Sequence, residues 1–296
     1  MPLAPRRAAV LGHPIAHSLS PVLHRAAYAA LGLTGWEYDA VDVTSETLGA
    51  FVTDLDDSWA GLSLTMPLKQ TIIALLDHIE PLAEVTGAVN TVVFSGVGAG
   101  RTLVGTNTDV YGLVTAIREG AVDSAPRGGA VVLGAGATAS STLAALAELG
   151  YPSADVYVRS LGRTGDLQRA AHRMGVTPRF HALDGAARAM LGAAVVVSTL
   201  PAHGADGVAG ELGALVAAGE SGVTGVLLDV CYEPRTTALA AAWSAAGGAV
   251  VGGQRMLLHQ AVEQVRLMTG RVAPTEAMAD ALEQALAQAP TRTLEA

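Results

Sequence analysis

The sequence predicts an α/β protein of two domains, the second of which is built on a doubly wound parallel sheet. The first observation is that short apolar segments alternate with helical patterns in two successive series. The second is that a segment rich in glycine, proline and small polar residues, 120–129, separates the two series, as expected of a connection between domains. The third is that half of the 296 residues are hydrophobic, which suffices for two cores of ordinary size.

The first series predicts an α/β unit. Its expected strands are 8–12, 37–43 and 60–65, and its expected helices are 20–32, 45–56 and 67–77. The second series predicts the parallel sheet. Its expected strands are 129–133, 154–159, 193–198 and 224–230, joined by helices rich in alanine and leucine. The C-terminal part predicts two helices, 256–268 and 274–289, the latter with a proline start and an acidic first turn.

Composition and charge argue against several classes of protein. The formal net charge of -9 opposes binding to nucleic acid, because that affinity comes from a surplus of lysine and arginine facing phosphate. Cys231 is the only cysteine, so no disulfide can form within the chain and no zinc site of paired cysteines can exist. We expect no metal site, no signal peptide and no membrane span, and a place in the reducing cytoplasm.

The basic residues are almost all arginine. Of the 18 lysines and arginines, Lys69 is the one lysine, which leaves 17 arginines. Arginine keeps its charge in practice permanently, whereas burial can bring a lysine amine into a range where it transfers protons. Lys69 is therefore a candidate catalytic residue, and the chance survival of one surface lysine is the alternative.

A glycine-rich turn opens the second series. In VVLGAGATASS, Gly134, Gly136 and Ala139 match G-x-G-x-x-A directly after an apolar strand and at the start of a helix. The first glycine permits a tight turn, the second lets the backbone approach a pyrophosphate, and the small third residue lets the helix pack close to the sheet. This context favours a Rossmann-like dinucleotide site over a turn that binds nothing. The expected cofactor-binding residues of the turn are Gly134, Ala135, Gly136, Ala137 and Thr138.

The end of the next expected strand favours NADP over NAD. In an NAD site, the strand that follows the glycine-rich turn usually ends, about 20 residues after the turn, with an Asp or Glu that binds the ribose 2′-hydroxyl. This strand is instead followed by Arg159, Ser160 and Arg163. Guanidinium groups can fork onto a 2′-phosphate and stack on adenine. We therefore expect these three residues to bind NADP, the alternative being that one or both arginines only face solvent.

Polar residues gather at four further places where loops can hold a ligand on a rigid scaffold. They lie in GHPIAHSLSPVLH (12–24), SLTMPLK (63–69), GAVNT (87–91) with GTNTD (105–109), and GGQRMLLHQ (252–260). Together with the glycine turn, in this order and spacing, these segments resemble the shikimate dehydrogenase family over essentially the whole chain. The resemblance implies NADP-dependent reduction of 3-dehydroshikimate to shikimate, a step of chorismate and aromatic amino acid biosynthesis.

The resemblance also implies roles for individual residues. Lys69 and Asp109 are the catalytic pair, and Ser18 and Ser20 bind the substrate carboxylate. The remaining substrate-binding residues are Thr65, Asn90, Tyr232 and Gln260, and the nicotinamide end of the cofactor lies along 198–202, Val230 and Gly253. Residues 1–111 and 250–296 form the substrate domain, to which the C-terminal helices return, and 112–249 form the NADP domain. Assembly as a homodimer stays open.

The residue types suit this chemistry. Hydride reduction of a ketone leaves charge on oxygen, so a proton donor must lie within hydrogen-bond reach of that oxygen. Lys69 can supply the proton, and Asp109 can orient the amine and accept a substrate hydroxyl, with the two groups titrating as one unit. Two serine hydroxyls, together with backbone N–H groups, can bind a carboxylate without an arginine.

Several alternatives stay open. Ser20 and Asp109 can act as plain helix caps. A sister enzyme of the same fold could prefer quinate or an aminoshikimate, and a non-catalytic sensor could keep the dinucleotide site alone. The chain also departs from the family pattern, with Ser63 and Arg25 where asparagine is common and with a changed residue order at 159–160.

Overall fold

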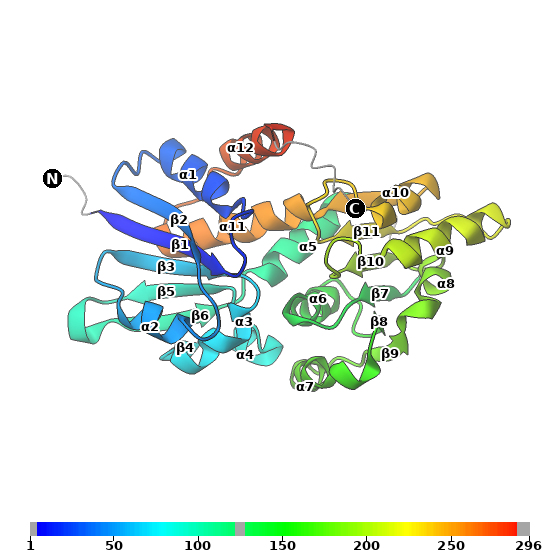
Figure 1. Ribbon diagram of the computed structural model, residues 1–296, viewed down its shortest axis with the longest axis horizontal. Coiled ribbons are helices and arrows are strands. Elements are labelled where there is room, and N and C mark those ends of the chain that lie inside the picture. Colours follow the sequence, from blue (N-terminus) through cyan, green and yellow to red (C-terminus); the bar gives the residue numbers. More distant parts are fainter. Residues whose placement is uncertain (1–4, 122–127, 289–296) are drawn as a thin grey trace.

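The computed structural model describes residues 5–121 and 128–288. Two six-stranded sheets lie side by side, each with helices on both faces (Figure 1). The helices α5 (Asp109–Gly120) and α11 (Gly253–Thr269) pack against each other and contact both halves of the molecule. The predicted α/β architecture is confirmed. Most of the connection expected at 120–129 lies outside the described residues.

The first sheet is mixed. Its strand order is β2-β1-β3-β5-β6-β4, and the pairs β3–β5 and β5–β6 are antiparallel. The strands are β1 (Arg6–Gly12), β2 (Trp36–Asp42), β3 (Trp59–Leu64), β4 (His78–Ile79), β5 (Thr91–Ser95) and β6 (Thr102–Thr106). The last three strands were not predicted, because β4 is two residues long and β5 and β6 are short segments whose ends carry the polar residues of the predicted site.

Helices cover both faces of the first sheet (Figure 1). One core lies under α1 (Ser20–Ala30), α11 and α12 (Thr275–Gln288), and the other under α2 (Leu48–Thr53), η1 (Ile72–Leu75) and α4 (Pro81–Thr86). The helix predicted at 67–77 is divided into α3 (Leu68–Thr71) and the 3-10 turn η1, and the one predicted at 45–56 is shorter. The helices that were predicted at the C-terminus therefore do return to the first sheet.

The second sheet is parallel throughout, in the order β12-β11-β10-β7-β8-β9. Its strands are β7 (Ala130–Leu133), β8 (Ala154–Val158), β9 (Arg179–Ala182), β10 (Val195–Ser198), β11 (Val226–Asp229) and β12 (Ala249–Gly252). The four predicted strands are confirmed, whereas β9 and β12 were not predicted. Residues 250–252, which the sequence analysis placed in the other domain, pair with β11 here. The strand order reverses between β7 and β10, where doubly wound folds bind ligands beyond the strand ends.

The helices of the second sheet also divide between its faces. One core lies under α5, α6 (Ala137–Glu148) and α7 (Gly165–Met174), and the other under α8 (Ala186–Met190), α9 (Asp206–Ala217) and α10 (Ala238–Ala245). Trp243 of α10 is fully buried, and its indole N–H donates to Ala249 O at 3.0 Å. This contact satisfies the one polar group of a large apolar side chain.

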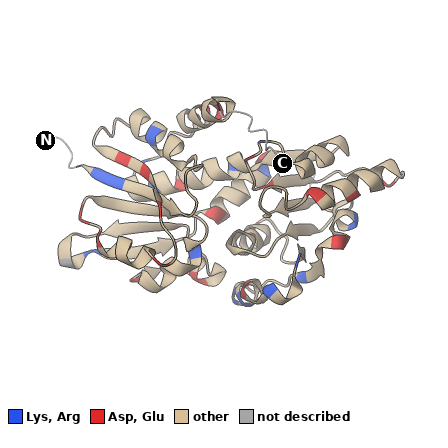
Figure 2. Cartoon of the chain, in the orientation of Figure 1, with Lys and Arg blue, Asp and Glu red and all other residues tan. Residues whose placement is uncertain are grey.

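Charged side chains are distributed over both halves, with acidic and basic residues interspersed (Figure 2). Where α5 meets α11, Glu119 accepts hydrogen bonds from Arg255 Nε at 2.7 Å and from His259 Nε2 at 2.7 Å. The Arg255 guanidinium is the main reason why the pKa of Glu119 lies below its usual value. None of the helices in the described part of the chain has both the length and the apolar character needed to cross a bilayer.

Candidate active site

Lys69 and Asp109 form an ion pair at one edge of the first sheet. Lys69 follows β3 and Asp109 follows β6, and these strands point the same way because both are antiparallel to β5. Their carboxyl ends therefore share an edge. Lys69 Nζ donates to Asp109 Oδ2 at 2.5 Å, and the two side chains are only 13% and 4% exposed. A pair so close and so shielded from water interacts strongly.

Asn90 holds the other oxygen of the Asp109 carboxylate. Its Nδ2 donates to Asp109 Oδ1 at 2.8 Å, and its Oδ1 accepts the backbone N–H of Thr108 at 2.7 Å. Because a backbone N–H can only donate, this second contact fixes the orientation of the amide and turns its NH₂ group toward Asp109. Asn90 is 2% exposed, so water does not compete for these bonds.

Gln260 brings α11 into the same cluster. Its Oε1 lies 3.4 Å from Asn90 Nδ2. The helices approach closely here, since a Cβ at Gly112 of α5 would lie 3.1 Å from Gln260 N and 2.8 Å from Met256 O. The structure thus brings together four of the predicted site residues, Lys69, Asn90, Asp109 and Gln260.

Ser18, Ser20 and Thr65 lie at the same edge, after β1 and β3. Ser18 Oγ accepts the N–H of Ser20 at 3.3 Å, and Thr65 N donates to Leu11 O at 2.9 Å. Within residues 5–121 and 128–288, no hydrogen bond joins the three hydroxyl groups to Lys69 or Asp109. The helix-cap alternative does not hold for Ser20 or Asp109, since each is the first helical residue and Leu19 and Thr108 precede them as caps.

The glycine turn joins β7 to α6, as predicted. Gly134 has a φ of 108°, and a Cβ there would lie 2.4 Å from Thr199 Oγ1, so the position requires glycine. Gly136 precedes the first turn of α6, and a Cβ there would meet nothing within 4 Å. Ala139 is fully buried against the sheet. An open space before a helix N-terminus fits the pyrophosphate of a dinucleotide.

A hollow of about 470 Å³ lies beside this turn. It is lined by Ala135, Gly136 and Ala137 of the turn and by Arg163 from the segment after β8. Arg159 and Ser160 are exposed directly after β8 and are not among the lining residues. Arg169 of α7 does line the hollow, and the sequence analysis missed it because a third arginine on a polar helix face carries no motif.

Val230 and Gly253 meet at the ends of β11 and β12. A Cβ at Gly253 would lie 2.2 Å from Val230 O, which leaves room only for glycine. Thr199 Oγ1 donates to Leu133 O at 2.8 Å and holds the segment 198–202 against the glycine turn. Tyr232 is partly buried, which raises the pKa of its hydroxyl. The residues predicted for the nicotinamide end therefore lie along the carboxyl edge of the second sheet.

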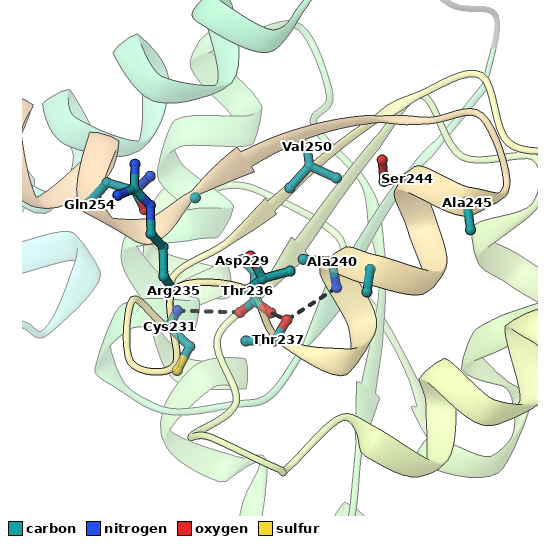
Figure 3. A pocket seen from close by; sticks show the side chains of 12 residues that line it. Asp229, Cys231, Arg235, Thr236, Thr237, Ala240, Ser244, Ala245, Val250 and Gln254 are labelled. Carbon is teal, nitrogen blue, oxygen red and sulfur yellow. Dashed lines mark hydrogen bonds between the residues drawn. The ribbon is translucent and has the colours of Figure 1, made fainter. Parts of the chain in front are cut away.

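A larger hollow of about 600 Å³ is lined by α10, β12 and the segment that leads from the end of β11 to α10 (Figure 3). Asp229 accepts the hydroxyl of Thr237 at 2.6 Å and the N–H of Cys231 at 3.3 Å, and burial raises the pKa of this carboxyl. Thr237 in turn accepts the N–H of Ala240 at 3.1 Å and caps α10. Neither the Lys69 pair nor the glycine turn lines this hollow. The hydrogen bond from Thr237 to Asp229 ties the start of α10 to β11.

Hydrogen bonds hold the two halves together beside the site. Ser140 Oγ donates to Thr86 O at 2.5 Å, and Asn107 Nδ2 donates to Ser141 Oγ at 2.9 Å. Both serines lie in α6, which starts at the glycine turn, and Asn107 lies two residues before Asp109. The helix that faces the expected cofactor is thereby fixed to the segment that carries Asp109.

Comparison with known proteins gives consistent matches. Residues 10–92 match the shikimate dehydrogenase substrate binding domain, and residues 253–283 match the shikimate 5'-dehydrogenase C-terminal domain. The shikimate dehydrogenase (NADP(+)) of Paramagnetospirillum magneticum is 38% identical over 87% of this chain and 90% of its own length. The crystal structure of Mycobacterium tuberculosis shikimate dehydrogenase has a TM-score of 0.81 at 41% identity and covers 95% of this chain and 100% of that one.

A third similar protein carries ligands. Shikimate 5-dehydrogenase from Thermus thermophilus, in complex with NADP(H) and shikimate, has a TM-score of 0.75 at 32% identity. The match covers 95% of this chain and 100% of that chain. Both halves of the molecule, and the junction that carries the Lys69 cluster, are therefore included in the similarity.

Proposed function

Because the chain belongs to the shikimate dehydrogenase family, we propose that it catalyses the reversible NADP-dependent reduction of 3-dehydroshikimate to shikimate. Lys69 and Asp109 are its proton-handling pair. The observation that carries this proposal is the 2.5 Å contact between Lys69 Nζ and Asp109 Oδ2, in a cluster that also contains Asn90 and Gln260. A protein that only bound a dinucleotide would have no use for this cluster.

The pair performs the proton part of the reaction. NADPH, when bound, supplies the hydride. As charge builds up on the ketone oxygen, Lys69 and Asp109 together deliver one proton to it, and the product is a hydroxyl group. Asp109 orients the ammonium group, and Asn90 keeps the carboxylate in place through Oδ1. In the reverse direction the same pair accepts the proton of the hydroxyl.

The substrate lies between the two halves in this proposal. Ser18 and Ser20 bind its carboxylate through hydroxyl and backbone groups, since both follow β1 at the edge where Lys69 lies. Thr65, Asn90, Gln260 and Tyr232 bind the ring hydroxyls. The substrate domain is 1–111 with 250–296, and the NADP domain is 112–249, although strand β12 adds residues 250–252 to the second sheet.

The glycine turn and the hollow beside it fit NADP. In this proposal, residues 134–138 bind the pyrophosphate, and Val230 and Gly253 bind the nicotinamide end of the cofactor. Arg159, Ser160 and Arg163 bind the 2′-phosphate. Of these three residues, Arg163 has the stronger structural support, because it lines the hollow. No acid stands at the end of β8, where an NAD enzyme would bind the 2′-hydroxyl.

A direct assay tests the substrate and the cofactor together. We expect the purified protein to oxidise shikimate with NADP faster than it oxidises quinate with NAD, measured as the absorbance of the reduced nucleotide. Shikimate with NAD and quinate with NADP complete the set. A higher rate for quinate with NAD would instead identify the sister enzyme, and the absence of turnover on every pair would indicate a sensor.

Replacing the arginines tests the cofactor assignment. We expect Arg159→Ala and Arg163→Ala to weaken NADP binding by about 10- to 100-fold, the size of a lost charge-assisted hydrogen bond, while NAD binding changes little. Nucleotide titration by tryptophan fluorescence or calorimetry measures both. Arg188→Ala is the matched control, because Arg188 is an exposed arginine of α8 that pairs with Glu220. Equal weakening of NADP and NAD would contradict the assignment.

A further inference from the structure

We propose that Gln264 is a positioning residue for Asp109, acting through the hydroxyl of Thr91 and the amide of Asn90. This inference rests on the proposed function, since it concerns the orientation of the same carboxylate. Gln264 lies one helical turn after Gln260 on α11 and is 1% exposed. It makes no hydrogen bond to Lys69 or Asp109, so its effect must pass through other side chains.

The amide of Gln264 is held in one orientation. Its Oε1 lies 2.9 Å from Ser63 Oγ and 3.2 Å from His24 Nε2, and its Nε2 lies 3.0 Å from Thr91 Oγ1 and 3.4 Å from Asn90 O. Turning the amide over would place Oε1 against the carbonyl of Asn90, where two acceptors would face each other. The NH₂ group therefore points to Thr91.

This orientation sets the direction of the next hydrogen bond. Because Thr91 Oγ1 accepts from Gln264, its single proton is left for a neighbouring oxygen. Asn90 Oδ1 at 3.0 Å is nearer than Thr108 Oγ1 at 3.2 Å, and the Asn90 oxygen can only accept. Asn90 Oδ1 is thus surrounded by three donor groups: the Thr91 hydroxyl, the backbone N–H of Thr108 and, at 3.2 Å, the Thr108 hydroxyl. Asn90 Nδ2 is then directed at Asp109 Oδ1, at 2.8 Å.

The far side of Gln264 is also fixed. Ser63 Oγ accepts from Tyr38 at 2.6 Å and donates to Gln264 Oε1. His24, which is fully buried and stacked on Tyr38 at a centroid distance of 3.8 Å, presents Nε2 to the same oxygen. A directed chain of hydrogen bonds therefore runs from the core of the first domain to the catalytic carboxylate, and Gln264 is its central member.

The test uses variants at both ends of the Gln264–Thr91 contact. Gln264→Met keeps the length of the side chain but cannot donate, and Thr91→Val keeps the shape but has no hydroxyl. We expect each to lower kcat for shikimate oxidation by about five- to tenfold, the size of one lost hydrogen bond, with the KM for NADP unchanged. The double variant is expected to lose no more than either single one, because both break the same chain.

Two further variants separate positioning from packing. Val265→Ala removes an equally buried neighbour of Gln264 on α11 and is expected to lower the melting temperature while leaving kcat near normal. Thr91→Ser keeps the hydroxyl and is expected to lose less than about threefold in kcat, whereas Thr91→Val loses the full amount. The comparison of Thr91→Ser with Thr91→Val still decides the question if Gln264→Met does not fold.

Two results would overturn the proposal. One is a kcat for Gln264→Met equal to that of the unaltered protein, and the other is a double variant whose losses multiply, which would mean that the two residues act independently. The unaltered protein is assayed first on shikimate and on quinate. If only quinate reacts, the proposed substrate is wrong, and the same variants are then compared on quinate, where Asp109 is still expected to depend on Gln264.

Discussion

Lys69→Ala is expected to lower kcat for shikimate oxidation by about 10²- to 10⁴-fold, the usual contribution of a positioned general acid or base. The amine lies 2.5 Å from Asp109, and its side chain is 13% exposed, so water reaches it poorly. Single-turnover rates with saturating shikimate and NADP measure the effect. Circular dichroism confirms that the fold persists, because Asp109 keeps its hydrogen bond from Asn90.

Two controls separate loss of the proton donor from loss of charge. Lys69→Arg keeps a cation but holds its proton too tightly for transfer, so we expect it to be nearly as slow as Lys69→Ala. Small primary amines added to Lys69→Ala are expected to restore part of the rate, whereas tertiary amines of similar basicity are too bulky to do so. A turnover of Lys69→Ala close to normal would remove this residue from the mechanism.

The sequence pointed to both members of the buried ion pair, Lys69 and Asp109, because each stands beside a local signal. Lys69 is the sole lysine and follows an expected strand, and Asp109 ends a polar segment before a helix. The glycine turn was predicted for the same reason, since its meaning depends on a strand and a helix that are adjacent in the chain. Signals of this kind need no knowledge of which distant segments meet.

Contacts between distant segments could not be predicted in this way. Gln264 lies 201 residues from Ser63 and 240 from His24, and only the packing of α11 on the first sheet brings them together. The sequence did show Ser63 as a departure from the family pattern, without a reason. The structure supplies one, because the serine leaves its hydroxyl to bridge Tyr38 and Gln264.

The mixed arrangement of the first sheet could not be predicted either. The hairpin of β5 and β6 makes the sheet mixed, and its strands were hidden because the polar residues at their ends were the more conspicuous feature. Asn90 is one of these polar residues: it lies just before β5 and donates a hydrogen bond to Asp109. Functional positions are where local patterns of strand and helix are expected to fail.

His24, the buried residue at the far end of the hydrogen-bond chain through Gln264, is expected to make the protein sensitive to acid. Desolvation lowers the pKa of His24 from 6.5 to about 3, against a smaller opposing effect of its hydrogen bond to Gln264. Below pH 6.5 the unfolded chain binds a proton at this residue and the folded chain does not, so stability present above that pH is lost as the pH falls toward 3. Each pH unit in this window costs up to about 1.4 kcal/mol, which amounts to about 2 kcal/mol at pH 5.

His24→Phe removes this titration while keeping an aromatic ring stacked on Tyr38. We expect the free energy of unfolding in urea to fall between pH 7.5 and pH 5 by about 2 kcal/mol more in the unaltered protein than in His24→Phe, a difference of about 30-fold in the folding equilibrium. Carboxylates such as Glu119 contribute equally to both proteins and cancel. His172→Ala, at an exposed position of α7, controls for the loss of a histidine as such. Equal acid sensitivity of the two proteins would contradict this prediction, because it would mean that the folded and unfolded chains bind a proton at His24 equally well.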